Sequence, residues 1–131
     1  MKLIVGGLFA GKWERLRELG FAPEEIADCR EVGLETAFEK PAVYRVNVLI
    51  RRMIEENRDL AELLTAVRTH PEIVIVCDEV GCGVVPADPL EREYREQVGR
   101  FCCEVAKLAS SVERVWCGIV TELKAGEDYA E

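Results

Sequence analysis

Short apolar runs alternate along this chain with longer stretches in which apolar residues recur at helical spacing. The run at 2–5 is followed by two glycines, and the run at 73–77 is an unbroken series of β-branched residues closed by a cysteine. Such runs are typical of buried strands, and the second fits a parallel strand covered on both faces. Weaker apolar segments at 26–29 and 114–119 predict two further strands.

Between these runs, apolar residues recur at helical spacing. One helix is predicted at 11–19, and a charged amphipathic helix is predicted at 90–108. Between 41 and 67 the apolar spacing predicts one long helix, or two helices broken near Asn57.

Strands that alternate with helices in this order imply right-handed crossovers. We therefore expect an α/β protein with a layered, mainly parallel sheet of about four strands. A chain of 131 residues can bury one core but not two, so residues 1–131 are expected to form a single domain. The glycines and prolines between 81 and 89 predict a structured loop, and the tail at 125–131 is expected to be loose.

The composition argues against a membrane protein and against a nucleic-acid partner. Apolar residues make up 49% and charged residues 32%, and no apolar run approaches the roughly 18 residues that a membrane helix needs. The N-terminal apolar stretch is too short for a secretion signal, so a cytoplasmic location is expected. The net charge of −8 argues against nucleic acid as a partner.

The chain has six cysteines and one histidine, His70, without the spacing of a zinc site. We expect reduced thiols, with Cys77 and Cys117 in buried strands.

The residues after the first predicted strand, 6–12, match the phosphate-loop pattern GxxxxGK at the start of a predicted helix. Its glycines allow backbone N–H groups to turn toward a phosphate, and Lys12 can reach the outer phosphates. The next position normally carries a hydroxyl that holds Mg²⁺, but here it is Trp13. The motif therefore favours phosphate binding over phosphoryl transfer. The alternative is a glycine turn with the lysine on the solvated surface.

Two acids, Asp78 and Glu79, follow the strongest predicted strand. Ligands of open parallel sheets bind outside the carboxyl ends of the strands, so this pair is expected to face the phosphate loop. The acids could orient Mg²⁺ or water, hydrogen-bond a sugar or base, or cap loop amides. The candidate nucleotide-binding residues are Gly6, Gly7, Ala10, Gly11, Lys12, Trp13, Asp78 and Glu79.

The stretch that begins at these acids resembles a known family. Residues 79–99 nearly match N-E-V-G-x-G-I-V-P followed by L-x-R-x-[FY]-R-[DE]-x-x-G, which is the pattern of the adenosylcobinamide kinase/adenosylcobinamide-phosphate guanylyltransferase family. Residues 118–124 resemble the family's closing G-x-P-x-x-L-K, with Val120 in place of the proline.

This resemblance implies a P-loop NTPase fold of the RecA-like type, a three-layer sandwich that assembles as a homo-oligomer. It also implies GTP or ATP, with Mg²⁺, as one ligand, a corrinoid as another, and a role in cobalamin biosynthesis. The family phosphorylates adenosylcobinamide and then transfers GMP through a guanylylated histidine. By the same resemblance Lys12 and Glu79 are the catalytic candidates, and Asp28, in a segment like the family's acidic-cysteine strand end, is the metal candidate.

The sequence departs from the family where its chemistry takes place. Trp13 replaces the phosphate-loop hydroxyl, Asp78 replaces an asparagine, and Cys102-Cys103 replaces Asn-Gln. The segment at 21–67, where the acceptor histidine belongs, contains no histidine. Three interpretations stay open: a family-type enzyme, a nucleotide- or corrinoid-binding homologue without the reaction, and a partner subunit that assembles through the last helix.

Overall fold

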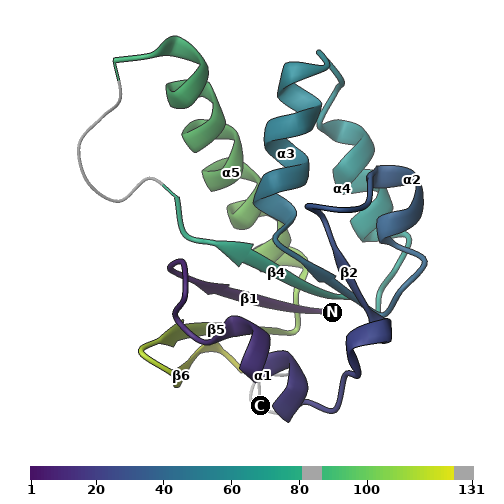
Figure 1. The fold of residues 1–131 in the computed structure, drawn as a ribbon, viewed down its shortest axis with the longest axis vertical. Helices are drawn as coiled ribbons and strands as arrows, with labels where there is room; N and C mark the ends of the chain where they lie inside the picture. Colours follow the sequence, from purple (N-terminus) through teal and green to yellow (C-terminus); the bar gives the residue numbers. More distant parts are fainter. Residues whose placement is uncertain (81–86, 126–131) are drawn as a thin grey trace.

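The computed structural model describes residues 1–80 and 87–125, and Figure 1 shows the course of the chain. The strands of the described residues are β1 (Lys2–Gly6), β2 (Ile26–Asp28), β3 (Ala42–Tyr44), β4 (Val74–Asp78), β5 (Ser111–Trp116) and β6 (Ile119–Lys124). The α-helices are α1 (Lys12–Glu18), α2 (Leu34–Ala37), α3 (Val46–Glu55), α4 (Ala61–Arg68) and α5 (Pro89–Leu108), and a 3₁₀ helix, η1 (Pro23–Glu25), precedes β2.

The described strands form one six-stranded sheet in the order β2-β3-β4-β1-β5-β6. All neighbours are parallel except β5 and β6, which are antiparallel. The α/β class and the mainly parallel sheet agree with the sequence prediction, but the expected number of about four strands was wrong. The central strand β1 is buried between β4 and β5, as its apolar run predicts.

One missed strand is β3, which the sequence analysis placed at the start of a long helix. A run of three residues is too short for periodicity to separate strand from helix. The strand ends where Arg45 adopts a left-handed backbone with φ 60°, and α3 begins at the next residue. The alternative of two helices broken near Asn57 is confirmed, because Asn57 has φ 55° between α3 and α4.

The other missed strand is β6. The predicted strand at 114–119 is wrong at its end, because Cys117 and Gly118 turn the chain with φ of 51° and 75°. Ile119 then starts β6, which runs back along β5. Cys117 is consequently exposed at the turn and not in a buried strand, whereas Cys77 is buried in β4 as expected.

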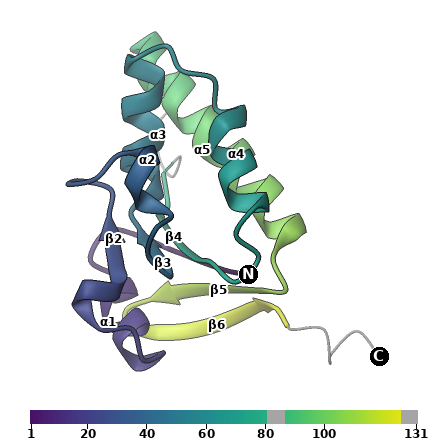
Figure 2. The same ribbon diagram turned by 90° about the vertical axis from the view of Figure 1, so that its right-hand side faces the viewer.

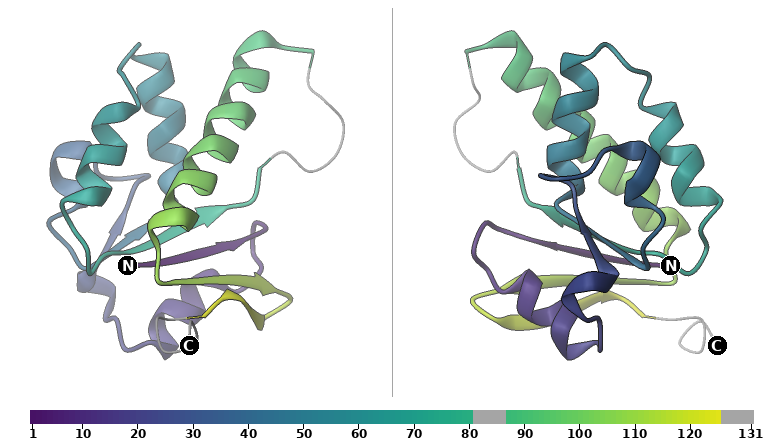
Figure 3. Two further views of the ribbon diagram at one scale, coloured as in Figure 1. Left: turned by 180° about the vertical axis from the view of Figure 1, so that it is seen from behind. Right: turned by 45° about the vertical axis from the view of Figure 1, so that its right-hand side comes forward.

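Helices cover both faces of the sheet, but unequally (Figures 2 and 3). On one face Leu16 of α1 packs on Ile4 and Val76. On the other face α2, α3, α4 and α5 pack over Leu3 and Ile75 and form the larger hydrophobic core. The residues of α5 that this core buries are Tyr94, Val98, Phe101 and Val105.

Helix α5 starts at a defined cap. The Asp88 carboxylate accepts a hydrogen bond from Leu90 N at 2.9 Å, and Pro89 occupies the first turn. Most of the predicted loop before this helix, residues 81–86, and most of the predicted tail, 126–131, lie outside the described residues. Within the described residues, no helix is long and apolar enough to span a membrane.

Candidate functional site

The loop between β1 and α1 contains the predicted phosphate motif. Gly6 ends the strand, and Gly11 precedes the helix with φ 106°, a backbone conformation that favours glycine. Gly118 N of the β5–β6 turn donates to Ala10 O at 2.8 Å, so the hairpin supports the loop from outside.

Lys12 occupies the centre of this region. Its side chain folds back toward the loop, donates to Gly7 O, and lies 2.9 Å from Asp78 Oδ1. Only 3% of the residue is exposed. The alternative in which Lys12 is a solvated surface residue is therefore wrong.

Asp78 receives further support from the helical layer. Asn47 of α3 accepts a hydrogen bond from Asp78 N at 3.0 Å and donates one to Asp78 Oδ2 at 3.4 Å. The same amide lies 3.2 Å from the Tyr94 hydroxyl of α5. The position of the carboxylate that holds Lys12 is thus fixed from β4, α3 and α5 together.

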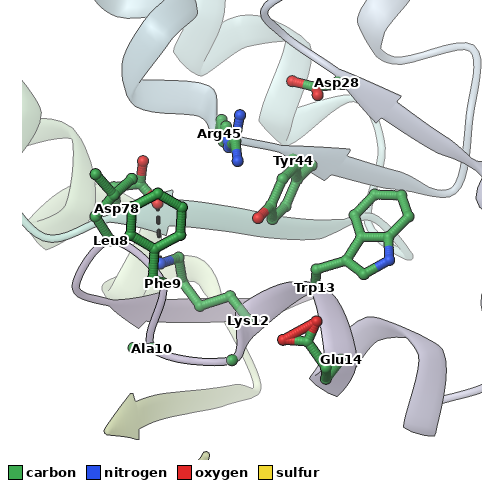
Figure 4. A pocket seen from close by; sticks show the side chains of 11 residues that line it. Leu8, Phe9, Ala10, Lys12, Trp13, Glu14, Asp28, Tyr44, Arg45 and Asp78 are labelled. Carbon is green, nitrogen blue, oxygen red and sulfur yellow. Dashed lines mark ion pairs between the residues drawn. The ribbon is translucent and has the colours of Figure 1, made fainter. Parts of the chain in front are cut away.

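A cavity of about 310 Å³ opens beside Lys12 (Figure 4). It lies at the carboxyl ends of β1 to β4, where ligands bind in open parallel sheets. Its lining residues are Leu8, Phe9, Ala10, Gly11, Lys12, Trp13, Glu14, Asp28, Tyr44, Arg45 and Asp78.

An aromatic wall lines the cavity between α1 and β3. The Trp13 and Tyr44 rings meet edge to face, with centroids 5.3 Å apart, and the Arg45 guanidinium lies 4.9 Å from the Tyr44 centroid. Burial raises the pKa of the Tyr44 hydroxyl, so this wall carries no negative charge near neutral pH. At the mouth, Phe9 of the loop is 90% exposed.

The sequence analysis missed Tyr44 and Arg45, since both depend on recognising β3. The available signal was the short Ala-Val-Tyr run after Pro41, which lies between two predicted parallel strands. A strand there would have put its carboxyl end, and these two residues, at the edge of the sheet where the phosphate loop lies.

The structure brings most of the predicted site residues to the cavity, but not all of them. The predicted residues that line the cavity are Ala10, Gly11, Lys12, Trp13, Asp28 and Asp78. Gly6 and Gly7 support the loop without lining the cavity. Glu79 also stays outside, because its carboxylate pairs with Arg114 of β5 at 3.2 Å and its N–H donates to Gly6 O at 2.7 Å.

A buried ion cluster anchors α1 beneath the site. Glu113 of β5 accepts two hydrogen bonds of 2.8 Å from the Arg15 guanidinium and one of 2.8 Å from Lys2 Nζ. The hydrogen bonds from Arg15, followed by the one from Lys2, lower the pKa of Glu113 to about 2. The cluster therefore ties α1, and with it Lys12 and Trp13, to β1 and β5.

His70 lies at the opposite end of β4 from Asp78. Its Nδ1 lies 2.7 Å from Ala66 O, and its ring packs at 5.3 Å from the Phe38 ring. The five residues of β4 lie between His70 and the cavity, so His70 is more than about 13 Å from the cavity along the strand. The chain's single histidine therefore does not reach the site.

A family model described as cobinamide kinase / cobinamide phosphate guanyltransferase matches residues 31–123. The bifunctional adenosylcobalamin biosynthesis protein CobU of Escherichia coli (strain K12) is 35% identical over 69 residues, which are 52% of this chain and 38% of that relative. The chain thus spans well under two thirds of that relative's length. The phosphate loop at 6–12 precedes the part of the chain that the family model matches.

Proposed function

This chain belongs to the cobinamide kinase / cobinamide phosphate guanyltransferase family, and on that premise we propose that it binds a nucleoside triphosphate, GTP or ATP, in the cavity beside Lys12. Family membership supports a role in cobalamin biosynthesis. The observation that carries the binding proposal is a buried lysine on a glycine-rich loop that lines a cavity at the carboxyl ends of parallel strands.

Three features of the cavity suit a nucleotide. The loop offers backbone groups and Lys12 to phosphates, as phosphate loops do. Trp13 and Tyr44 offer aromatic surface within reach of the same space. A volume of about 310 Å³ lies at the lower end of the range of small-molecule sites.

The proposal covers binding and not guanylyl transfer through histidine. That route needs an imidazole at the nucleotide, and His70 lies at the far end of β4. These observations favour a nucleotide-binding homologue over an enzyme with both family reactions.

Isothermal calorimetry of GTP and ATP with the wild-type chain tests the proposal, with Lys12→Met as the first variant. Loss of the ammonium should weaken binding by about 10- to 100-fold, the usual effect of removing a charge-assisted hydrogen bond. Because Lys12→Met leaves Asp78 buried without its cation, the double variant Lys12→Met/Asp78→Asn separates lost binding from lost stability.

The matched control is Lys107→Met, which removes an exposed lysine whose ammonium lies 3.3 Å from Glu104 on the surface of α5. This variant should bind both nucleotides like the wild type. Silent titrations with the wild type, or equal affinities for wild type and Lys12→Met, would contradict the proposed function.

A further inference from the structure

We propose that the cavity holds its phosphate ligand between two cationic side chains, Lys12 and Arg45, and that binding needs no divalent cation. This inference rests on the proposed function and specifies how the same site neutralises its ligand. Its basis is the poor fit of the available donors to Mg²⁺, together with an arginine whose buried Nε has no hydrogen-bond partner in the described chain.

The residues at the cavity do not form a Mg²⁺ site. At the position of the usual hydroxyl, Trp13 offers only an N–H donor. Asp78 is held by Lys12 and Asn47, and Asp28 Oδ1 accepts a hydrogen bond from Arg30 N at 3.0 Å. Nowhere in residues 1–80 and 87–125 do three histidine, cysteine or acidic side chains gather as a metal ion would require.

Acidic residues outnumber basic ones in the lining of the cavity, but their carboxylates do not point toward one common site. Glu14 lines the cavity but is exposed, so water screens its charge. The charge of Asp78 is matched by Lys12 at 2.9 Å. Among the lining residues, Arg45 is the cation for which the described chain provides no ion pair.

The environment of the Arg45 side chain suits phosphate binding. Its Nε is buried and makes no hydrogen bond with any described group. A buried donor left unpaired destabilises the protein, and a hydrogen bond to a ligand oxygen would remove this cost. The Tyr44 ring, 4.9 Å from the guanidinium, holds the group in place. The planar guanidinium suits phosphate oxygens because it can donate two parallel hydrogen bonds.

The backbone of Arg45 also indicates a fixed orientation. The residue has φ 60° and ψ 51°, a left-handed conformation that is strained for a residue with a side chain. This conformation turns the chain from β3 into the ten-residue helix α3. The amino end of that helix adds positive potential beside the guanidinium. In Figure 4, Arg45 lies near Tyr44 and Lys12 points to Asp78, and both cations belong to the lining of the cavity.

The test is calorimetry of GTP and ATP in EDTA and in excess Mg²⁺. We expect wild-type affinity in EDTA to equal or exceed that in Mg²⁺, because Mg²⁺ competes with the two side chains for the phosphates. Arg45→Gln should weaken binding by about 10- to 100-fold in both conditions. Arg45→Gly should weaken binding to the same extent. Because glycine adopts the left-handed conformation without strain, this second variant removes the side chain without stressing the backbone.

The matched control is Arg51→Gln, which removes an arginine that also lies over a tyrosine, 5.0 Å from the Tyr94 centroid, but outside the cavity. Its affinities should equal those of the wild type. Nucleotide binding that requires Mg²⁺, or that survives both Arg45 substitutions unchanged, would overturn this inference and leave the proposed function standing. Wild-type protein that binds no nucleotide in either buffer would overturn both.

Discussion

At the scale of single residues, the two adjacent glycines of the loop have different roles. A Cβ on Gly6 would lie 2.6 Å from Val115 O and 3.3 Å from the aliphatic stem of Lys12. A Cβ on Gly7 would have no neighbour within 4 Å. Gly6 is therefore required by the close approach of β5 and the lysine, and Gly7 is not.

Gly6→Ala should accordingly destabilise the protein by about 1–3 kcal/mol, the usual range for an overpacked core position. The added methyl group also meets the Lys12 stem, so nucleotide affinity should fall together with stability. Urea unfolding of both proteins at one pH gives the first quantity, and calorimetry gives the second.

Gly7→Ala is the matched control, because it adds the same methyl group to the same loop in open space. It should change stability by less than about 1 kcal/mol. Equal effects of the two substitutions would show that the close approach of Gly6 to Val115 O does not limit this loop.

At the scale of elements, α1 depends on the sheet for its stability. It has seven residues, fewer than an isolated helix needs in water. Leu16 buries its apolar side, and Arg15 joins Glu113 by a two-pronged ion pair. The helix that presents Lys12 and Trp13 to the cavity is thus fixed by contacts on its other side.

This cluster should make stability depend on pH in the acid range. The folded-state pKa of Glu113 is about 2 and its ordinary value is 4.5. The stabilisation is therefore complete above about pH 5 and is lost as the pH falls from 4.5 toward 2. Glu113→Gln should lower the free energy of unfolding near pH 6 by up to about 3 kcal/mol and flatten its dependence on pH below 5.

Urea unfolding between pH 6 and pH 3 measures this difference. Glu72→Gln is the control, because Glu72 is exposed and belongs to no ion pair of the described residues. Its pH profile should follow that of the wild type. A wild-type profile that Glu113→Gln leaves unchanged would contradict the assigned role of the cluster.

At the scale of the whole molecule, the strong sequence signals predicted the class of fold and part of the cavity. The apolar runs of β1 and β4 and the glycine motif led to Lys12 and Asp78. The α5 helix was predicted within one residue of its observed start. These features rest on local patterns that need no knowledge of the rest of the chain.

The side of the cavity formed by Tyr44 and Arg45 depends on the order of strands in the sheet. Strand β3 has three residues, and its pairing with β2 and β4 decides its conformation more than its own sequence does. Glu79 was predicted at the site because it follows β4, but Arg114 of the neighbouring β5 draws its side chain away. Such pairings join residues far apart in the chain, so local patterns do not reveal them.

The chain's two tryptophans allow a direct test of whether nucleotide binds in the cavity beside Trp13. Trp116 is 59% exposed on β5 and lies outside the cavity. In Trp116→Phe, where the remaining indole is that of Trp13, GTP or ATP should cause a saturable change in fluorescence, and in Trp13→Phe it should not. A change confined to Trp13→Phe, or none in either variant at saturating nucleotide, would contradict nucleotide binding in this cavity.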